Sequence, residues 1–288
     1  MAEARASIAV IGGSGLYEIE GLQDVQMVRL ETPFGDPSDE IVLAALGDKR
    51  IAFLPRHGRG HRISPSEVNS RANIYALKSL GVERIISVSA VGSMKENLAP
   101  LHAVIPDQLF DRTRQRPSTF FGNGLVVHIG FAEPFCPELS ELVYQAAVEC
   151  GATVQKGGTY VCIEGPQFST KAESRIYRQW GVDVIGMTAL PEAKLAREAE
   201  ICYATLAFVT DYDVWRESEE AVSVEMIVGN LLKNVRLAKR IIKNVVPKIP
   251  PQQNCLCATA LKNALITDPK RIPQQVKEDL APIIGRYV

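Results

Sequence analysis

The sequence predicts an α/β fold: a single domain with a mixed, mostly parallel β-sheet flanked by helices. Short apolar runs of strand length alternate with helix-patterned segments along most of the chain, which is typical of helix-covered, largely parallel sheets. Polar residues and glycines follow several of these runs, as expected where strands end in ligand-binding loops. At 288 residues with 46% hydrophobic content, the chain is long enough for one large domain of this class.

The predicted strands are short apolar runs bounded by turn residues. The run at 8–11 leads directly into glycines, and the runs at 41–46 and 50–54 are expected to pair through a turn at Gly47 and Asp48. Four further strands are predicted, in chain order, at 84–90, 160–164, 182–185 and 201–209.

The predicted helices begin with residues 66–80, where apolar residues recur at roughly helical spacing and Gly81 ends the segment. Two shorter helices follow at 172–180 and at 191–200, the latter with proline in its first turn. The longest, at 223–246, has an apolar face and a basic face, a pattern also found in helices that lie on membranes. Its apolar face contains no Trp or Phe, so we expect it to pack on the core with the basic face solvated.

Prolines at 247–251 interrupt the chain after this helix. We therefore assign residues 1–250 to one domain and residues 251–288 to a tail of short helices that packs on the same domain.

The charge balance and the hydropathy of the chain exclude several classes of partner. The net charge is −1, from 32 basic and 33 acidic residues, so no general basic excess indicates nucleic-acid binding. The N-terminus lacks an apolar signal core, and no apolar run approaches membrane-spanning length. We expect a cytoplasmic protein that binds neither nucleic acid nor membrane.

The six cysteines are scattered, and none forms a pair of C-x-x-C motifs, so the spacing argues against a zinc site. Cys162 and Cys202 lie in apolar runs and are expected to pack as small hydrophobic residues. A disulfide between Cys255 and Cys257 would close a small, strained ring, so reduced thiols are expected there.

Two acidic residues follow the strand predicted at 201–209. Asp211 and Asp213 are expected just past its carboxyl end, where open α/β sheets bind ligands. Carboxylates there suit a ligand that donates hydrogen bonds or must receive a proton. The adenine ring of a nucleoside does both, through its 6-amino group and through N7.

Two glycine-containing segments are candidate anion sites. The loop at 12–15 can bring backbone amides and the Ser14 hydroxyl toward an anion, although taken alone it also fits a purely structural turn. A dinucleotide site is excluded, because Glu18 stands at the third glycine position and no Walker lysine follows. The basic segment at 55–62 can bind phosphate through arginine, although taken alone it also fits a solvated loop.

Two further strand ends offer contacts to a sugar and a base. Small hydroxyl residues at 87–93 can bind phosphate or sugar hydroxyls, or form a tight turn. Phe168 offers an aromatic face and Met187 a soft apolar one, although core packing would also account for each. These segments contain neither a metal-ligand set nor a nucleophile–base pair, so phosphate together with a purine nucleoside is the economical combination.

The order of these motifs resembles that of the S-methyl-5′-thioadenosine phosphorylases, in the trimeric-type branch of the purine nucleoside phosphorylase superfamily. The resemblance covers roughly residues 8–250. It rests on the segments at 12–16, 32–35, 56–59, 69–76, 132–137, 164–168, 187–188 and 210–213. It implies a pentosyltransferase that converts methylthioadenosine and inorganic phosphate to adenine and 5-methylthioribose 1-phosphate, with no metal and no cofactor.

The resemblance also implies roles for individual residues. The phosphate site would comprise Ser14, Arg56, His57, Ser89, Ala90 and Thr188. Serine stands at 14 and 89 where the family often has threonine, and the hydroxyl is kept. The nucleoside site would comprise Phe168, Met187, Thr210, Asp211, Asp213, Val224, Ile227 and Val228, with Asp211 and Asp213 as the catalytic pair. His128 would enter from a neighbouring subunit, which implies a homo-oligomer, either a trimer or a dimer of trimers.

Two alternatives remain open at the level of sequence. A broader purine nucleoside phosphorylase would act on adenosine or on 6-oxopurine nucleosides, but the 6-oxopurine enzymes typically have asparagine where Asp211 stands. A non-catalytic nucleoside-binding protein would have no need for a second, anion-binding site.

Overall fold

The computed structural model describes residues 6–13, 16, 19–216 and 224–288, with backbone only for 224–228. In these residues eleven strands form one mixed sheet, in which parallel pairs outnumber antiparallel ones. The strands are β1 (Ile8–Gly12), β2 (Gln23–Val28), β3 (Ile41–Leu46), β4 (Lys49–Pro55), β5 (Arg84–Ser93), β6 (Ala103–Ile105), β7 (Gln108–Arg112), β8 (Val154–Lys156), β9 (Thr159–Ile163), β10 (Val184–Gly186) and β11 (Cys202–Asp211). The predicted fold class is confirmed.

The sheet divides at the long central strand β5. Strand β11 pairs with β5 along nearly its whole length, from Arg84 to Gly92. On the other edge of β5, β1 pairs only with the first half, at 84–87, and β10 pairs with Gly92 and Ser93. The ends of β1 and β10 are therefore separated along β5, and this gap in the sheet leaves room for a site.

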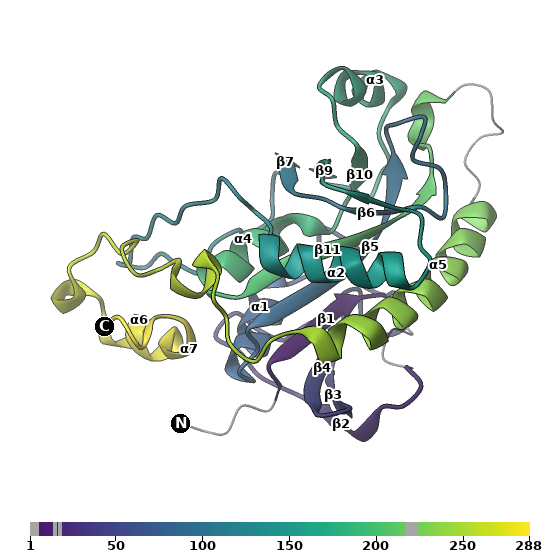
Figure 1. Ribbon diagram of the computed structural model, residues 1–288. Coiled ribbons are helices and arrows are strands. Elements are labelled where there is room, and N and C mark those ends of the chain that lie inside the picture. Colours follow the sequence, from purple (N-terminus) through teal and green to yellow (C-terminus); the bar gives the residue numbers. More distant parts are fainter. Residues whose placement is uncertain (1–5, 14–15, 17–18, 217–223) are drawn as a thin grey trace.

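Helices cover both faces of the sheet (Figure 1). On one face α2 (Pro137–Glu149) and α5 (Val224–Val245) share a core cluster that contains Val143 and Ile241. On the other face α1 (Ser70–Ser79) and α4 (Ala189–Glu198) share a second cluster that contains Ile74 and Leu195. A third cluster, beside α3 (Lys171–Gln179), includes Tyr177 and Val161.

The tail at 251–288 forms short helices, including α6 (Gln274–Asp279) and α7 (Ala281–Ile284). Figure 1 shows both helices beside α1. Ile272, Leu280, Ile283 and Ile284 are buried in the same cluster as α1 and α4. Among the described residues, no helix combines the length and the apolar character needed to cross a bilayer.

Some element boundaries differ from the sequence prediction. Helix α1 begins at Ser70 rather than 66, because the Asn69 side chain caps it by accepting the Ala72 N–H at 3.2 Å. Strand β11 continues through Asp211, so this carboxylate lies in the last residue of the strand rather than past its end. Helix α2 and strands β2, β6, β7 and β8 have no counterpart in the prediction.

Candidate active site

A cavity of about 500 Å³ opens at the gap in the sheet. This volume lies in the range of small-molecule sites. Its walls come mainly from six strands, β1, β4, β5, β9, β10 and β11, or the segments that follow them, and from α5. Ten of the residues predicted for the site line it: Arg56, His57, Ser89, Ala90, Phe168, Met187, Thr188, Thr210, Asp211 and Asp213. Three more lining residues, Leu16, His61 and Gly92, lie in segments that the sequence singled out but were not assigned to the site individually. Sequence reasoning missed Gly186, Leu231 and Asn234.

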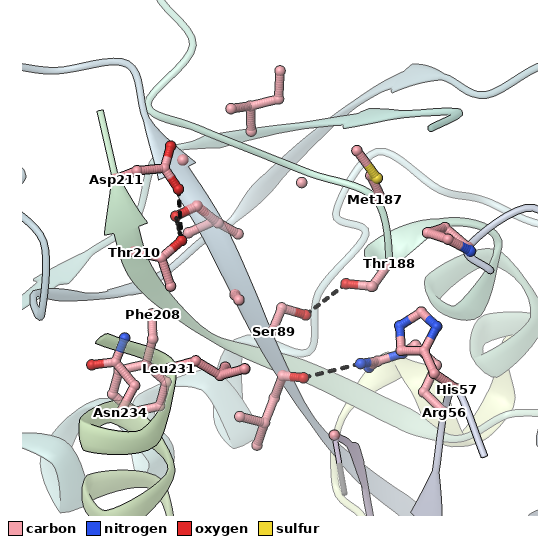
Figure 2. Close-up of a pocket in the computed structure, with 18 of the residues that line it drawn as sticks. Arg56, His57, Ser89, Met187, Thr188, Phe208, Thr210, Asp211, Leu231 and Asn234 are labelled. Atoms are coloured by element: carbon pink, nitrogen blue, oxygen red, sulfur yellow. Dashed lines mark hydrogen bonds between the residues drawn. The ribbon is translucent and has the colours of Figure 1, made fainter. Parts of the chain in front are cut away.

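The cavity has two chemically different ends (Figure 2). Thr210 and Asp211 lie on one side, at the end of β11, and Arg56 and His57 lie on the other, just after β4. Ser89 lies between them on β5. A ligand that fills this cavity would therefore meet a carboxylate at one end and cationic and hydroxyl groups at the other.

The acidic end is held by hydrogen bonds within β11 and the turn after it, and by one from α3. Asp211 Oδ2 accepts from Thr210 Oγ1 at 2.7 Å, and Asp211 Oδ1 accepts from the Asp213 backbone N–H at 2.8 Å. Asp213 Oδ2 accepts from Ser174 Oγ at 2.5 Å. Burial raises the pKa of both Asp211 and Asp213, although these hydrogen bonds oppose the change. The acidic end is thus suited to holding or sharing a proton.

Gly92 brings the backbone of β5 against these carboxylates. A Cβ built at this residue would lie 3.0 Å from Asp211 Oδ1 and 3.0 Å from Ile185 Cγ2. The absence of a side chain at Gly92 therefore lets the carboxylate lie beside the strand.

The opposite end contains linked hydroxyl groups. Ser89 Oγ and Thr188 Oγ1 are 2.7 Å apart, and Tyr160 OH lies 3.3 Å from Thr188 Oγ1. Burial raises the pKa of Tyr160, so its hydroxyl stays protonated. A Cβ at Gly186 would lie 2.0 Å from Tyr160 OH, so only glycine accommodates Tyr160 in this place. Hydroxyl groups arranged in this way can donate to the oxygens of an anion.

Arg56 is buried and largely engaged by protein groups. Its Nε and Nη2 donate to the Glu192 carboxylate at 2.5 and 3.1 Å. Its Nη1 donates to the Val88 carbonyl at 3.0 Å, and Nη2 donates to Ser87 Oγ at 2.7 Å. Burial alone would lower the pKa of Arg56, but the charge and hydrogen bonds of Glu192 outweigh it, and the pKa is raised. Arg56 thus has two roles: it provides a fixed positive charge at the wall of the cavity, and it forms a buried ion pair with Glu192.

His57 lies beside Arg56, and its Nδ1 is 2.9 Å from the Ile63 carbonyl. Burial and the Arg56 charge lower its pKa to about 4, so the ring is neutral at physiological pH. Since the Ile63 carbonyl can only accept, Nδ1 carries the proton and Nε2 is left as an acceptor. A neutral ring of this tautomer can accept a hydrogen bond from a monoprotonated phosphate.

Arg116 is a positioning residue that sequence reasoning missed. Its Nη1 donates to the carbonyls of Met187 and Leu190 at 2.6 and 2.7 Å, and its Nη2 donates to the Glu164 carbonyl at 2.5 Å. One buried guanidinium therefore ties the loop after β9 to the loop after β10. In the sequence it stands among other basic residues at 112–116, which is the pattern of a solvated loop.

Phe168 is 67% exposed although it lines the cavity, so its ring is available to stack on a ligand. Ser14 falls outside the described residues, and so do the side chains of Val224, Ile227 and Val228 in α5. From the same helix, Leu231, Asn234 and Val235 line the cavity.

His128 is exposed and does not line this cavity in the single chain. Its backbone N–H donates to the Ala264 carbonyl of the tail at 2.9 Å. The prediction that it completes the site of a neighbouring subunit stays a prediction.

Comparison with known proteins relates the whole chain to one family. The profile of the phosphorylase superfamily matches residues 7–247. An S-methyl-5′-thioadenosine phosphorylase of Geobacter sulfurreducens is 62% identical over 282 residues, which cover 98% of this chain and 99% of that one. A second protein of that name, from Koribacter versatilis, is 57% identical and covers 98% of this chain and 97% of its own length.

Solved structures agree with these relatives. A methylthioadenosine phosphorylase from an Antarctic soil metagenomic library superimposes with a TM-score of 0.93 at 53% identity, covering 98% of this chain and 99% of that chain. A mutant of the adenosine/methylthioadenosine phosphorylase of Schistosoma mansoni, solved in complex with methylthioadenosine, has a TM-score of 0.82 at 36% identity. That match covers 89% of this chain and 96% of that chain.

Proposed function

The chain belongs to the S-methyl-5′-thioadenosine phosphorylases of the phosphorylase superfamily, and we propose that it is a pentosyltransferase acting on methylthioadenosine. The reaction consumes inorganic phosphate and releases adenine and 5-methylthioribose 1-phosphate, which places the enzyme in purine and methionine salvage. The observation that carries this proposal is the cavity with a protonatable carboxylate at one end and an anion-binding set at the other.

At the anion end, phosphate is held by the Ser89 and Thr188 hydroxyls, by His57 and by the charge of Arg56. The distance of 2.7 Å between Ser89 Oγ and Thr188 Oγ1 supports this, because both hydroxyls can then turn toward one oxyanion. We assign the Ala90 backbone and Ser14 to the same phosphate on the resemblance alone. Phosphate bound here would attack the anomeric carbon as the glycosidic bond breaks.

At the acidic end, adenine is recognised by Asp211 and Asp213. The raised pKa of Asp211 lets this group hold or share the proton that N7 needs when the base leaves. Asp211 and Asp213 together accept from the 6-amino group, which lies beside N7 on the purine, and Thr210 orients the Asp211 carboxyl by donating its hydroxyl hydrogen to it. Phe168 stacks along the purine, and Met187 packs against the sugar and bonds it through its backbone.

The 5′-methylthio group is enclosed by apolar side chains near the start of α5, namely Val224, Ile227 and Val228. The neighbouring Leu231 and Val235 support an apolar surface there. The proposed chemistry uses neither a metal nor an organic cofactor, and phosphate is a co-substrate. We further propose a cytoplasmic homo-oligomer, a trimer or a dimer of trimers, in which His128 reaches the 5′ pocket of the next subunit.

The decisive experiment is product analysis with methylthioadenosine, adenosine and inosine, each with and without phosphate. Adenine release from methylthioadenosine that depends on phosphate, together with formation of the 1-phosphate sugar, is the expected result. Faster turnover of inosine would favour a 6-oxopurine enzyme. Binding of methylthioadenosine with no product in the presence of phosphate would indicate a non-catalytic binding protein and overturn the proposal.

A further inference from the structure

Four of the six cysteines converge at a place remote from the cavity. Cys136 is the N-cap residue of α2, and Cys202 is the first residue of β11. Cys255 and Cys257 lie at the first short helix of the tail. Their four Sγ atoms all lie within 4.8 Å of one another, so three segments far apart in sequence present thiols to one point. The sequence spacing of the cysteines argued against a zinc site, but the fold brings four of them together all the same.

The separations within the cluster are closer to those of a four-sulfur metal site than to those of disulfides. Cys255 Sγ lies 3.7 Å from Cys136 Sγ and 3.1 Å from Cys202 Sγ. Sulfurs bound to one zinc ion at about 2.3 Å stand about 3.8 Å apart at the corners of a tetrahedron. The two sulfurs of a disulfide are only about 2.05 Å apart. Disulfides would also join the cysteines in separate pairs and would not require all four to meet at one point.

The surroundings are those of a closed structural site. Cys136, Cys202 and Cys257 are buried and Cys255 is partly buried. The Gln253 side-chain amide donates to Cys202 Sγ at 3.2 Å, a contact that orients and stabilises a sulfur ligand. Cys136 lies at the N-terminus of a 13-residue helix, where the backbone favours thiolate. With all four positions taken by sulfur, no coordination position is left open for a substrate.

We propose that Cys136, Cys202, Cys255 and Cys257 bind one structural Zn²⁺ ion. Binding converts four thiols to thiolates and releases their four protons, with no change of oxidation state. Zinc is chosen over harder cations because all four ligands are soft thiolates, a ligand set that zinc binds with tetrahedral geometry. The ion would fasten the tail to the beginning of β11 and to α2.

The ion would not take part in the reaction. Strand β11 has ten residues and runs from Cys202 to Asp211. At roughly 3.3 Å per residue, the two ends are roughly 30 Å apart. Loss of the ion should therefore lower the stability of the tail while leaving the chemistry of the cavity intact where the protein remains folded.

The test begins with the full-length wild-type protein, produced in zinc-containing medium and desalted. Elemental analysis is expected to find one zinc per chain. A mercurial reagent that modifies thiols should release this zinc to a colorimetric chelator in step with modification of four thiols. Cobalt reconstitution should give the visible bands of a tetrahedral thiolate complex. These measurements use no substitution, so they do not depend on a variant that folds.

Variants then identify the ligands. The double variant Cys255→Ser/Cys257→Ser should lose the zinc and show a lower melting temperature. Cys150→Ser, a substitution of a cysteine outside the cluster, should keep both unchanged. Zinc-free wild-type protein with four reactive thiols, an intact mass lowered by disulfide formation, or stoichiometric iron in place of zinc would each overturn the assignment.

Discussion

At the scale of single residues, the site depends on side chains whose protonation and partners are set by burial. Burial raises the pKa of Asp211 and Asp213 and lowers the pKa of His57. In each case the shift favours the neutral form of the side chain. These residues could be selected from sequence because acidic and basic groups at strand ends are chemically conspicuous. Their supports could not, because Glu192 and Arg116 look like ordinary charged residues until the fold buries them.

Asp211→Asn should shift preference from 6-aminopurine toward 6-oxopurine nucleosides. An asparagine amide can donate to a 6-oxo group, whereas the aspartate accepts from adenine. An unmatched buried polar contact costs about 1–3 kcal/mol, so the ratio of kcat/KM for methylthioadenosine to that for inosine should fall by roughly 5- to 150-fold. The parent ratio measured in the same assay is the reference, and an unchanged ratio would remove Asp211 from base recognition.

Arg56→Ala should both destabilise the protein and weaken phosphate binding. It leaves the Glu192 carboxylate buried with its main partner gone, which typically costs about 3–5 kcal/mol of unfolding free energy. Urea unfolding would measure this loss, and steady-state kinetics would measure the KM for phosphate.

The double variant Arg56→Met/Glu192→Met separates the two roles. Replacing both charges with apolar groups of similar length should recover much of the lost stability. If Arg56 contributes to phosphate binding, the KM for phosphate stays raised in this variant. Recovery of the wild-type KM together with stability would show that the arginine is purely structural.

At the scale of elements, sequence reasoning located most elements near the site and misplaced some of their ends. Apolar runs identified β1, β4, β5 and β11, because strands in the middle of a sheet are buried on both faces. It missed β6 and β8, which have three residues each and too little pattern to detect. It also could not foresee that β5 pairs with β1 and β10 in succession, because that arrangement depends on contacts distant in sequence. The cavity is a product of this pairing.

The C-terminal turn of α4 should make stability depend on pH through Glu198. This buried carboxylate accepts from Thr119 Oγ1 and from the Phe120 N–H, both at 2.8 Å, and burial raises its pKa to about 7. In the folded state Glu198 therefore binds a proton more tightly than in the unfolded state, where its pKa is about 4.5. Stability from this group is complete below about pH 4.5 and is lost as the pH rises through 7.

Glu198→Gln should remove that dependence, because glutamine imitates the protonated acid: its oxygen can accept from Phe120 and its amide can donate to Thr119. The variant should be more stable than wild type at pH 8 and similar to it at pH 4.5. Melting temperatures of both proteins across this range measure the difference. Parallel curves for the two proteins would show that Glu198 is already ionised in the fold.

At the scale of the whole molecule, the tail supports the segment that carries His128, the residue predicted to contact a neighbouring subunit. The Val126 N–H donates to Thr267 Oγ1 at 2.8 Å, and the Ile266 N–H donates to the Val126 carbonyl at 2.9 Å. Together with the bond from His128 to Ala264, these contacts hold the exposed 126–128 segment against the tail. These hydrogen bonds fix the position of the segment on the surface. A fixed position is what His128 needs if it is to enter the site of a neighbouring subunit.

If His128 completes the site of the next subunit, two defective variants should complement each other. Subunits with Asp211→Ala lack their own acid but carry His128, and subunits with His128→Ala carry the acid but lend no histidine. When the two are dissociated, mixed and reassembled, some sites receive Asp211 from one subunit and His128 from the other. Activity per intact Asp211 should then rise above that of the His128→Ala protein alone, in proportion to hybrid formation. Each variant reassembled by itself is the control. An active monomer in light scattering at assay concentration, or hybrids with no gain in activity, would exclude a shared site, because mass action ties a shared site to the oligomer.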